Sequence, residues 1–226
     1  MFGMGLDGFG ELLLLGTLTT LFVTAAGAVI GSLLGVIGAA AKLSPWRVAQ
    51  KIAGAYTVIV RGVPDLLVIF LVYYGGSTTI SHLLGKPVTV NAFLAGSIAL
   101  GFVFGAYTTE IFRGALLELP RGQTEAAAAL GLPGYQTFLH ITAPQAWRLA
   151  RPAFSNQLTV LLKDTSLISL VGLEDLMRRT NIAVEATNRP FAFYVAAGVL
   201  YMILTFVLTA CIRTRGRRSP AAYARG

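Results

Sequence analysis

Five charged residues lie within or beside long apolar stretches of this sequence: Arg61, Asp65, Glu110, Lys163 and Asp164. An ionised side chain costs roughly 3 kcal/mol or more at the centre of a bilayer, so such residues usually face a cavity or an oppositely charged partner. Two interpretations are open. The five residues could line a polar path through a helical bundle, or they could neutralise one another and reach towards water from helix ends.

The spacing of these charges predicts how they are arranged. Arg61 and Asp65 are four residues apart, so they could pair on one face of a helix. Lys163 and Asp164 are adjacent, so they should point to different sides of a helix. Helix ends alone explain two charges within one apolar run less easily than single charges. The pair Lys163 and Asp164 is therefore the stronger candidate for a polar path.

The other reactive residue types form no catalytic or metal-binding pattern. His82 and His140 fall in segments that we predict on opposite sides of a membrane, and Cys211 is the only cysteine, so no intrachain disulfide can form. The sequence also lacks the G-x-x-x-x-G-K-[ST] phosphate loop of ATP-hydrolysing proteins. We therefore expect no catalytic residue, no metal site and no cofactor in this chain, and any ATP hydrolysis would come from a partner.

The composition indicates a membrane protein. Of the 226 residues, 55% are hydrophobic and only 12% are charged, against about 25% charged residues in soluble domains. The net charge is +8, but the basic residues flank apolar runs. Basic residues so placed favour membrane orientation and contact with anionic lipid headgroups, and they argue against a nucleic-acid partner.

Five apolar runs are long enough to cross a bilayer, at about residues 12–41, 52–74, 92–112, 153–173 and 191–212. They must be helical, because an open strand edge would leave backbone groups unpaired in lipid. The fold class that we expect is an all-α polytopic membrane protein, with five transmembrane helices in a single domain over residues 1–226. No Lys or Arg precedes the first run, which favours a retained helix over a signal peptide.

The Lys and Arg residues predict the orientation. With the N-terminus outside and the C-terminus inside, twelve of the 18 basic residues fall in inner segments and four in outer ones. This bias agrees with the rule that cytoplasmic loops are enriched in positive charge. The first span also carries Gly27, Gly31 and Gly35 on one face, a spacing that lets another helix approach closely. Glycine is common in membrane helices, so the spacing alone leaves its role open.

The longest stretch outside the predicted spans is residues 113–152, which faces the cytoplasm in this orientation. Residues 125–130 are strong helix formers, Gly131 is a natural helix stop and Pro133 lies just beyond it. The pattern predicts a short helix between Gly122 and Gly131. Such a helix is too short to be stable alone, and its small Ala-rich surface suits insertion into a groove of a partner protein.

This loop carries a recognisable pattern: Glu125, Ala126 and Ala127, then Gly131 after three residues, Ile141 after nine more, and Pro144. The pattern resembles the EAA signature of ABC-importer permease subunits, with the departure that Ala143 stands where the wider family has Leu. Further segments resemble the polar amino acid branch, and within it the permeases for histidine, arginine and opine-type substrates: residues 61–64, 106–114, 120–123, 144–146 and 163–167.

The resemblance implies a type I ABC importer permease whose cytoplasmic coupling loop, residues 113–152, docks on an ATPase. The chain would be the transmembrane subunit of an ATP-driven importer for polar, in particular basic, amino acids or opines, and would work by alternating access. Its partners would be an ABC ATPase dimer that binds ATP and Mg, a second like or related permease, and an external amino-acid-binding protein. Its location would be the bacterial cytoplasmic (inner) membrane.

The family's coupling role for Glu125 and Gly131 has simpler alternatives. A carboxylate is favourable at the start of any helix, and glycine ends many helices. In the predicted path, Thr165 and Ser166 could complete a polar pocket around the Asp164 carboxylate, which would hold or pass a cationic substrate. Alternatively, Lys163 and Asp164 mark a helix end near the cytoplasmic surface.

Two other classes of function are possible. An ion-coupled secondary amino acid carrier usually shows internal inverted repeats, which we do not find, and five spans cannot form two equal halves. A membrane scaffold without transport is the third class. An ATPase that copurifies in stoichiometric amounts would favour the importer, whereas uptake driven by an ion gradient alone would favour the carrier.

Overall fold

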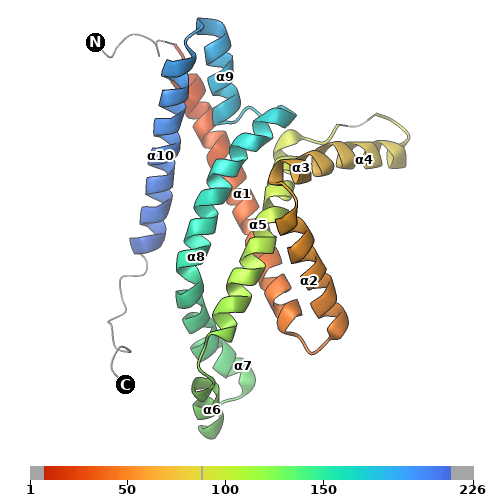
Figure 1. The fold of residues 1–226 in the computed structure, drawn as a ribbon, viewed down its shortest axis with the longest axis vertical. Coiled ribbons are helices and arrows are strands. Elements are labelled where there is room, and N and C mark those ends of the chain that lie inside the picture. Colours follow the sequence, from red (N-terminus) through yellow and green to blue (C-terminus); the bar gives the residue numbers. More distant parts are fainter. Residues whose placement is uncertain (1–7, 88, 215–226) are drawn as a thin grey trace.

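The computed structural model describes residues 8–87 and 89–214, and every regular element in this part is helical (Figure 1). The elements are α1 (Gly10–Leu43), α2 (Arg47–Gly62), α3 (Asp65–Phe70), η1 (Leu71–Gly75), α4 (Gly76–Leu84), α5 (Ala92–Leu117), α6 (Arg121–Ala129), α7 (Gly134–Thr137), η2 (Phe138–Thr142), α8 (Ala143–Asp164), η3 (Thr165–Val171), α9 (Leu176–Thr187) and α10 (Pro190–Thr214). Elements η1 and η2 are turns of π-helix, and η3 is a 3-10 helix. The all-α prediction is confirmed.

The bundle is built around α1 and α5, which lie side by side along its length (Figure 1). Glycines of α1 face α5, and Thr108 Oγ1 donates a hydrogen bond of 3.0 Å to the backbone oxygen of Gly31. A Cβ atom added at Gly31 would lie only 2.7 Å from the backbone oxygen of Gly101. The glycine spacing predicted from the sequence therefore does bring another helix close, and that helix is α5.

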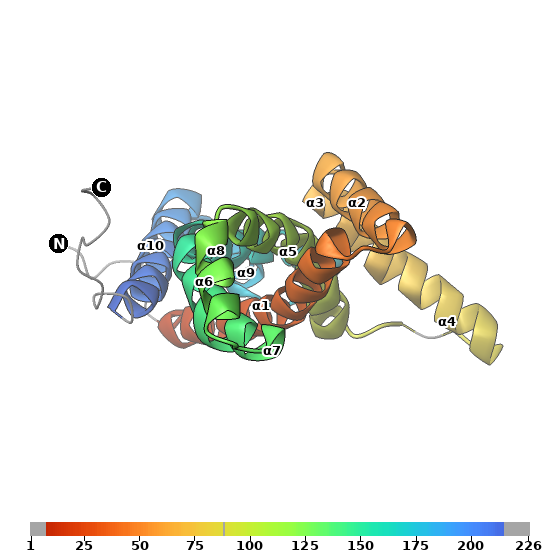
Figure 2. The ribbon, with the colours of Figure 1, turned by 90° about the horizontal axis from the view of Figure 1, so that it is seen from below.

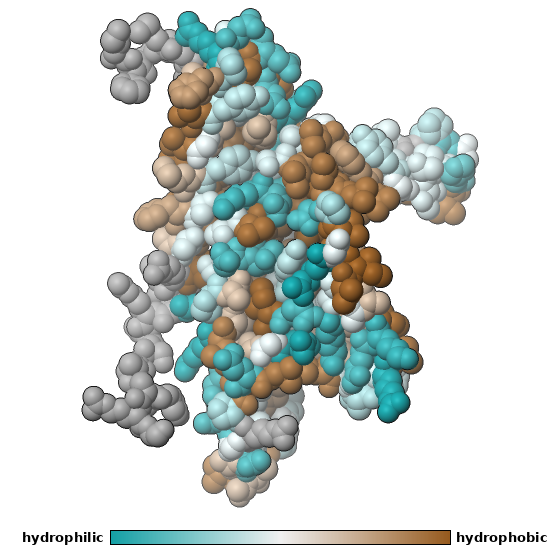
Figure 3. Space-filling model, in the orientation of Figure 1, coloured by the Kyte–Doolittle hydropathy of each residue, from teal (hydrophilic) through white to brown (hydrophobic). Residues whose placement is uncertain are grey.

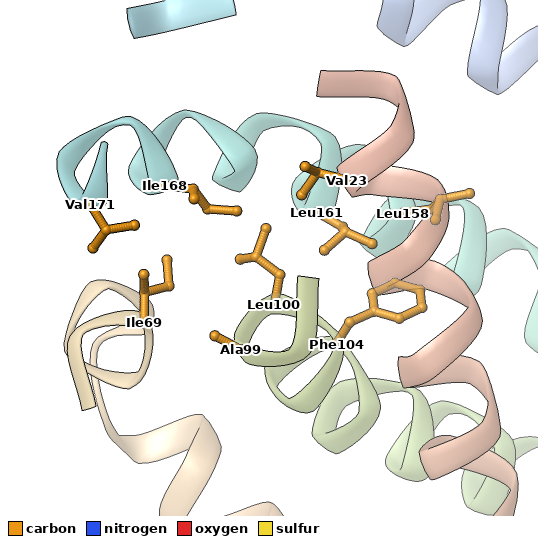
Figure 4. Packing of buried hydrophobic residues seen from close by; sticks show 9 residues of the cluster. All are labelled: Val23, Ile69, Ala99, Leu100, Phe104, Leu158, Leu161, Ile168 and Val171. Carbon is orange, nitrogen blue, oxygen red and sulfur yellow. The ribbon is translucent and has the colours of Figure 1, made fainter. Parts of the chain in front are cut away.

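A cluster of buried side chains joins the central pair to α3, α8 and η3 (Figure 4). Its members come from five elements that are far apart in the sequence: Val23, Ile69, Ala99, Leu100, Phe104, Leu158, Leu161, Ile168 and Val171. Helix α10 lies along one edge of the bundle, and α2 with α3 lies on the opposite side (Figures 1 and 2). The short helix α4 projects sideways from the bundle.

Four of the described helical stretches are long and apolar enough to cross a membrane: Gly10–Leu43, Asp65–Leu84, Ala92–Leu117 and Pro190–Ile212. They match three of the five predicted runs closely and overlap a fourth. The exception is the predicted run 153–173, which the structure forms from the end of α8 and from η3. Its polar residues keep the hydropathy of α8 low, and the number of crossings stays a prediction.

The predicted run 52–74 is divided in the structure. Helix α2 ends at Gly62, and α3 begins at Asp65. Val63 and Pro64 between them have extended backbone, with ψ of 140° and 133°. The residue before a proline disfavours helical backbone, and proline itself is accepted at the start of a helix, so the chain breaks here and starts a new helix.

The predicted loop 113–152 is largely helical. Helix α5 continues to Leu117, and α8 begins at Ala143, so α6, α7 and η2 occupy the stretch between them. The predicted short helix is present as α6. Part of the basic C-terminal segment used for the predicted orientation, Arg215, Arg217, Arg218 and Arg225, lies outside the described residues.

Candidate functional site

Helix α6 ends in a complete Schellman motif. The backbone N–H of Leu132 donates to the oxygen of Ala127 at 3.1 Å, and that of Gly131 donates to the oxygen of Ala128 at 3.0 Å. Gly131 has a φ of +73°, the left-handed conformation that this motif requires and that glycine adopts without a steric penalty. Local sequence therefore determines where the helix stops and in which direction the chain leaves it.

The helix lies at one end of the bundle together with α7 (Figure 1). It packs against α7 and η2 through Ala127, which is buried, whereas Glu125 and Ala126 are exposed. The residues that follow expose large apolar side chains: Leu130 is 80% exposed and Tyr135 is 74% exposed. A small helix with exposed apolar side chains beside it has the properties of a docking surface.

The remaining residues of the predicted coupling signature lie at the base of this tip. Ile141 lies in η2 and is half-buried, and Pro144 lies two residues after this π-helical turn, inside the continuous helical stretch 134–164. The structure thus brings Glu125, Gly131 and Pro144 to one end of the molecule, although their roles stay a prediction.

Glu110 lies in an ion-pair network between helices. Its carboxylate pairs with Lys42 Nζ at the end of α1, and with Arg113 Nε at 2.9 Å on its own helix. Lys42 Nζ also donates to Thr57 Oγ1 of α2 at 2.6 Å. The network connects α1, α2 and α5, so in this structure Glu110 is neutralised within the bundle, as the second interpretation of the sequence proposed.

The predicted pairing of Arg61 with Asp65 is wrong. No ion pair joins Arg61 to Asp65, although both lie in the part of the chain that the structure describes. Because the chain breaks between α2 and α3, the spacing of four residues no longer places the two side chains on one helix face. The Arg61 guanidinium instead lies over the ring of Tyr107, 5.2 Å from its centre, in a cation–π contact.

Lys163 and Asp164 face different neighbours, as their adjacency predicted. Lys163 is exposed and lines a hollow between α8 and α10. Asp164 is half-buried and near enough to Asp65 of α3 for the two carboxylates to repel each other. The fold therefore brings together two acidic residues that the sequence keeps far apart.

The hydroxyls of Thr165 and Ser166 do not open into a pocket. Thr165 is fully buried, and its Oγ1 donates to the backbone oxygen of Leu162 at 2.8 Å. Ser166 Oγ donates to the backbone oxygen of Lys163 at 2.8 Å. Both bonds satisfy carbonyls at the end of α8, where the helix tightens into η3, so both residues act here as local caps.

A groove runs between α8 and α10, with polar side chains along its α8 side and mainly apolar surface along α10. It consists of two adjoining hollows of about 540 and 420 Å³, which share Thr205 and Thr209 of α10. The α8 side of the groove is lined by polar and charged residues at helical spacing: Arg151, Ser155, Asn156, Thr159 and Lys163. Figure 3 shows polar surface along the middle of the molecule with apolar surface on both sides. We call this feature the α8–α10 groove.

The sequence does not single out the residues of the groove and the network. Lys42 is one of the basic residues of the predicted inner segments, and Asn156 and Thr159 lie within the predicted run 153–173. The signal that could have identified the groove is the weak hydropathy of that run, which is lowered by polar residues every three or four positions. No comparable signal points to the partner of Lys42.

The family of binding-protein-dependent transport system inner membrane components matches residues 27–218 of the chain. The chain is 42% identical over 231 residues to the octopine transport system permease protein of Rhizobium radiobacter, with 100% of this chain and 98% of that protein covered. It is 40% identical over 217 residues to the histidine/lysine/arginine/ornithine transport system permease protein of Salmonella typhimurium, covering 94% of this chain and 95% of that protein.

The fold is similar to that of a chain in the crystal structure of an amino acid ABC transporter with histidines. The TM-score is 0.82 at 29% sequence identity, with 95% of this chain and 97% of that chain covered. The resemblance stated from the sequence is therefore confirmed over nearly the whole chain.

Proposed function

The chain belongs to the family of binding-protein-dependent transport system inner membrane components, and on that premise we propose that it moves basic amino acids or opines into the cell. The relatives named above are permeases for octopine and for histidine, lysine, arginine and ornithine. Substrates of this class carry a guanidinium or ammonium group together with a carboxylate. The chain would be the transmembrane subunit, and other subunits would hydrolyse the ATP.

The observation that carries the proposal is the exposed helix α6, which is held by its Schellman cap at one end of the bundle. A partner that binds this tip would act on α8, because α6 packs against α7 and η2, and these two elements continue into α8 without a break. We assign the partner as an ABC ATPase dimer that binds ATP and Mg. Closure of the ATPases would move the tips and rock the helices between two states.

The α8–α10 groove is the part of this chain that we assign to the substrate path. Its polar side chains and its cation Lys163 suit the carboxylate of an amino acid. The pair Asp65 and Asp164 does not line this groove, and we assign it as a separate acidic position that suits the positive group. The path would be completed by a second permease subunit, like or related to this one, and the substrate would be delivered by an external binding protein.

The orientation in the bacterial inner membrane follows from the Lys and Arg distribution, with α6 inside and α9 outside. The tip and α9 lie at opposite ends of the bundle (Figure 1), which supports this assignment. A reporter inserted at Gly85 should be external. A cytoplasmic signal at Gly85, together with a periplasmic signal at Gly134 in the tip, would invert the proposed orientation.

The experiment that tests the proposal is uptake into proteoliposomes by the purified complex, with labelled octopine, arginine, histidine and a neutral amino acid as substrates. Uptake should require ATP and the binding protein, and it should favour the cationic substrates. Uptake driven by a proton or sodium gradient without ATP would instead support the ion-coupled carrier. A chain that purifies without an ATPase in mild detergent would argue against the assigned partner.

A further inference from the structure

A buried polar junction lies at the end of the bundle opposite α6, where α1, η3, α9 and α10 meet. Asp175 caps α9 and is fully buried; its Oδ1 accepts the backbone N–H of Arg178 at 2.8 Å. Its other oxygen, Oδ2, is buried and has no hydrogen-bond partner among the described residues. The same is true of the hydroxyl of Tyr201 on α10.

The Tyr201 hydroxyl lies within the electrostatic influence of Asp175, although no hydrogen bond joins the two groups. That hydroxyl also lies near the hydroxyls of Thr20 and Thr165, although it makes no hydrogen bond of ordinary geometry with them. Both threonines are fully buried, and Thr20 Oγ1 accepts the backbone N–H of Leu176 at 3.2 Å. Four oxygen-bearing side chains from four elements therefore lie near one another with buried oxygen atoms, and the Tyr201 side chain also lines the α8–α10 groove together with Lys163.

No cationic side chain balances a charge on Asp175. From α9, Arg179 turns its guanidinium to Glu174, 3.0 Å away, and Arg178 contributes its backbone N–H. From α1 the neighbours are Gly16 and Thr20, from η3 Thr165, and from α10 Tyr201. A buried carboxylate is costly without a charged partner, whereas the neutral acid can donate a hydrogen bond.

We propose that Asp175 is a proton-binding site that holds this junction together. In the packed state Oδ2 carries the proton, so the buried group is a neutral acid and needs no cation beside it. When the proton leaves to water, the charged carboxylate needs hydration, which requires the junction between α1, α9 and α10 to loosen.

The electrostatics of the site agree with this geometry. Burial raises the pKa of Asp175 from its ordinary 3.8 to about 6, and backbone N–H groups of α9 oppose the shift without cancelling it. The folded protein therefore binds this proton more tightly than the unfolded chain does. It follows that the stability contributed by the site is greatest at acid pH and is lost as the pH rises through about 6.

The direct test is infrared spectroscopy of the full-length chain in lipid, as the pH is raised from 5 to 8. A protonated buried carboxyl has a carbonyl stretching band that a carboxylate lacks. This band should be lost in Asp175→Asn and kept in the control Glu185→Gln, which removes an exposed carboxylate of α9. In Tyr201→Phe, which removes a neighbouring hydroxyl, the frequency of the band should shift. If Asp175→Asn does not fold, the band of the unsubstituted protein and its shift in Tyr201→Phe still test the proposal.

Thermal unfolding at the two pH values is the second readout. Raising the pH from 5 to 8 should lower the Tm of the unsubstituted chain and of the control Glu185→Gln. This decrease should be about 4 °C larger than the decrease in Asp175→Asn. A protein without the carboxyl band at pH 5, or an Asp175→Asn variant with the same band and the same pH dependence as the unsubstituted chain, would overturn the proposal.

Discussion

The contact between α1 and α5 makes a sharp prediction, because two glycines on the same face of α1 have very different surroundings. A Cβ added at Gly27 would have its nearest neighbours 3.6 Å away, an ordinary contact. A Cβ added at Gly31, four residues later, would lie 2.6 Å from Phe104 Cδ1, 2.7 Å from the oxygen of Gly101 and 2.9 Å from the nitrogen of Gly105.

The expected cost of Gly31→Ala follows from what would have to move. Two of the three close atoms belong to the α5 backbone, so relief requires the helices to separate rather than a side chain to rotate. Overpacking of this kind typically costs about 1–3 kcal/mol. Separation would also stretch the hydrogen bond from Thr108 to the Gly31 oxygen, a bond of about 1 kcal/mol. We expect a net loss of about 2 kcal/mol, after about 1 kcal/mol gained in helix propensity.

The matched control is Gly27→Ala, with the same change on the same helix and face. It should gain helix propensity without overlap, so its stability should be unchanged or raised by up to about 1 kcal/mol. The assay is reversible unfolding in mixed detergent micelles, followed by circular dichroism, with thermal unfolding as a check. Gly31→Ala should lower the Tm by about 4–8 °C. If the two variants differ by less than about 0.5 kcal/mol, the argument from close backbone contact is refuted.

Three further predictions concern the site residues. Gly131→Ala forces a side chain into the left-handed backbone, at a cost of about 1–2 kcal/mol, and should reduce transport and ATPase stimulation together. The control Gly134→Ala has φ in the ordinary range and open space around it, so it should reduce neither. Equal uptake by the two variants would show that the cap of α6 has no role in coupling. Glu110→Gln leaves Lys42 without its carboxylate and should destabilise the bundle by about 2 kcal/mol in a denaturant titration. The control Glu118→Gln, at an exposed position, should change the stability by less than about 0.5 kcal/mol. A larger loss of stability in Glu118→Gln than in Glu110→Gln would contradict the role of the ion-pair network. Asp164→Asn should reduce uptake of cationic substrates about tenfold and of neutral ones little, measured side by side in proteoliposomes; equal loss for both would count against a role in the path.

The sequence by itself determined the class of the protein and several local features. The composition and the lengths of the apolar runs were enough to predict helices in a membrane, because each helix satisfies its backbone within a few residues. The short helix α6 and its end at Gly131 were predictable for the same reason: the Schellman bonds connect residues at most five positions apart. Adjacency alone also predicted that Lys163 and Asp164 point to different sides.

The tertiary structure decided which helix faces meet, and with them the environment of each charge. Lys42 and Glu110 pair across 68 residues, and Asp65 approaches Asp164 rather than Arg61 because the chain breaks at Pro64. Asp175 is kept away from water and from cations because four separate elements pack around it. Hydropathy and helical periodicity record only neighbours along the chain. Contacts between distant segments depend on how all the helix faces pack at once, so these partners had to be observed.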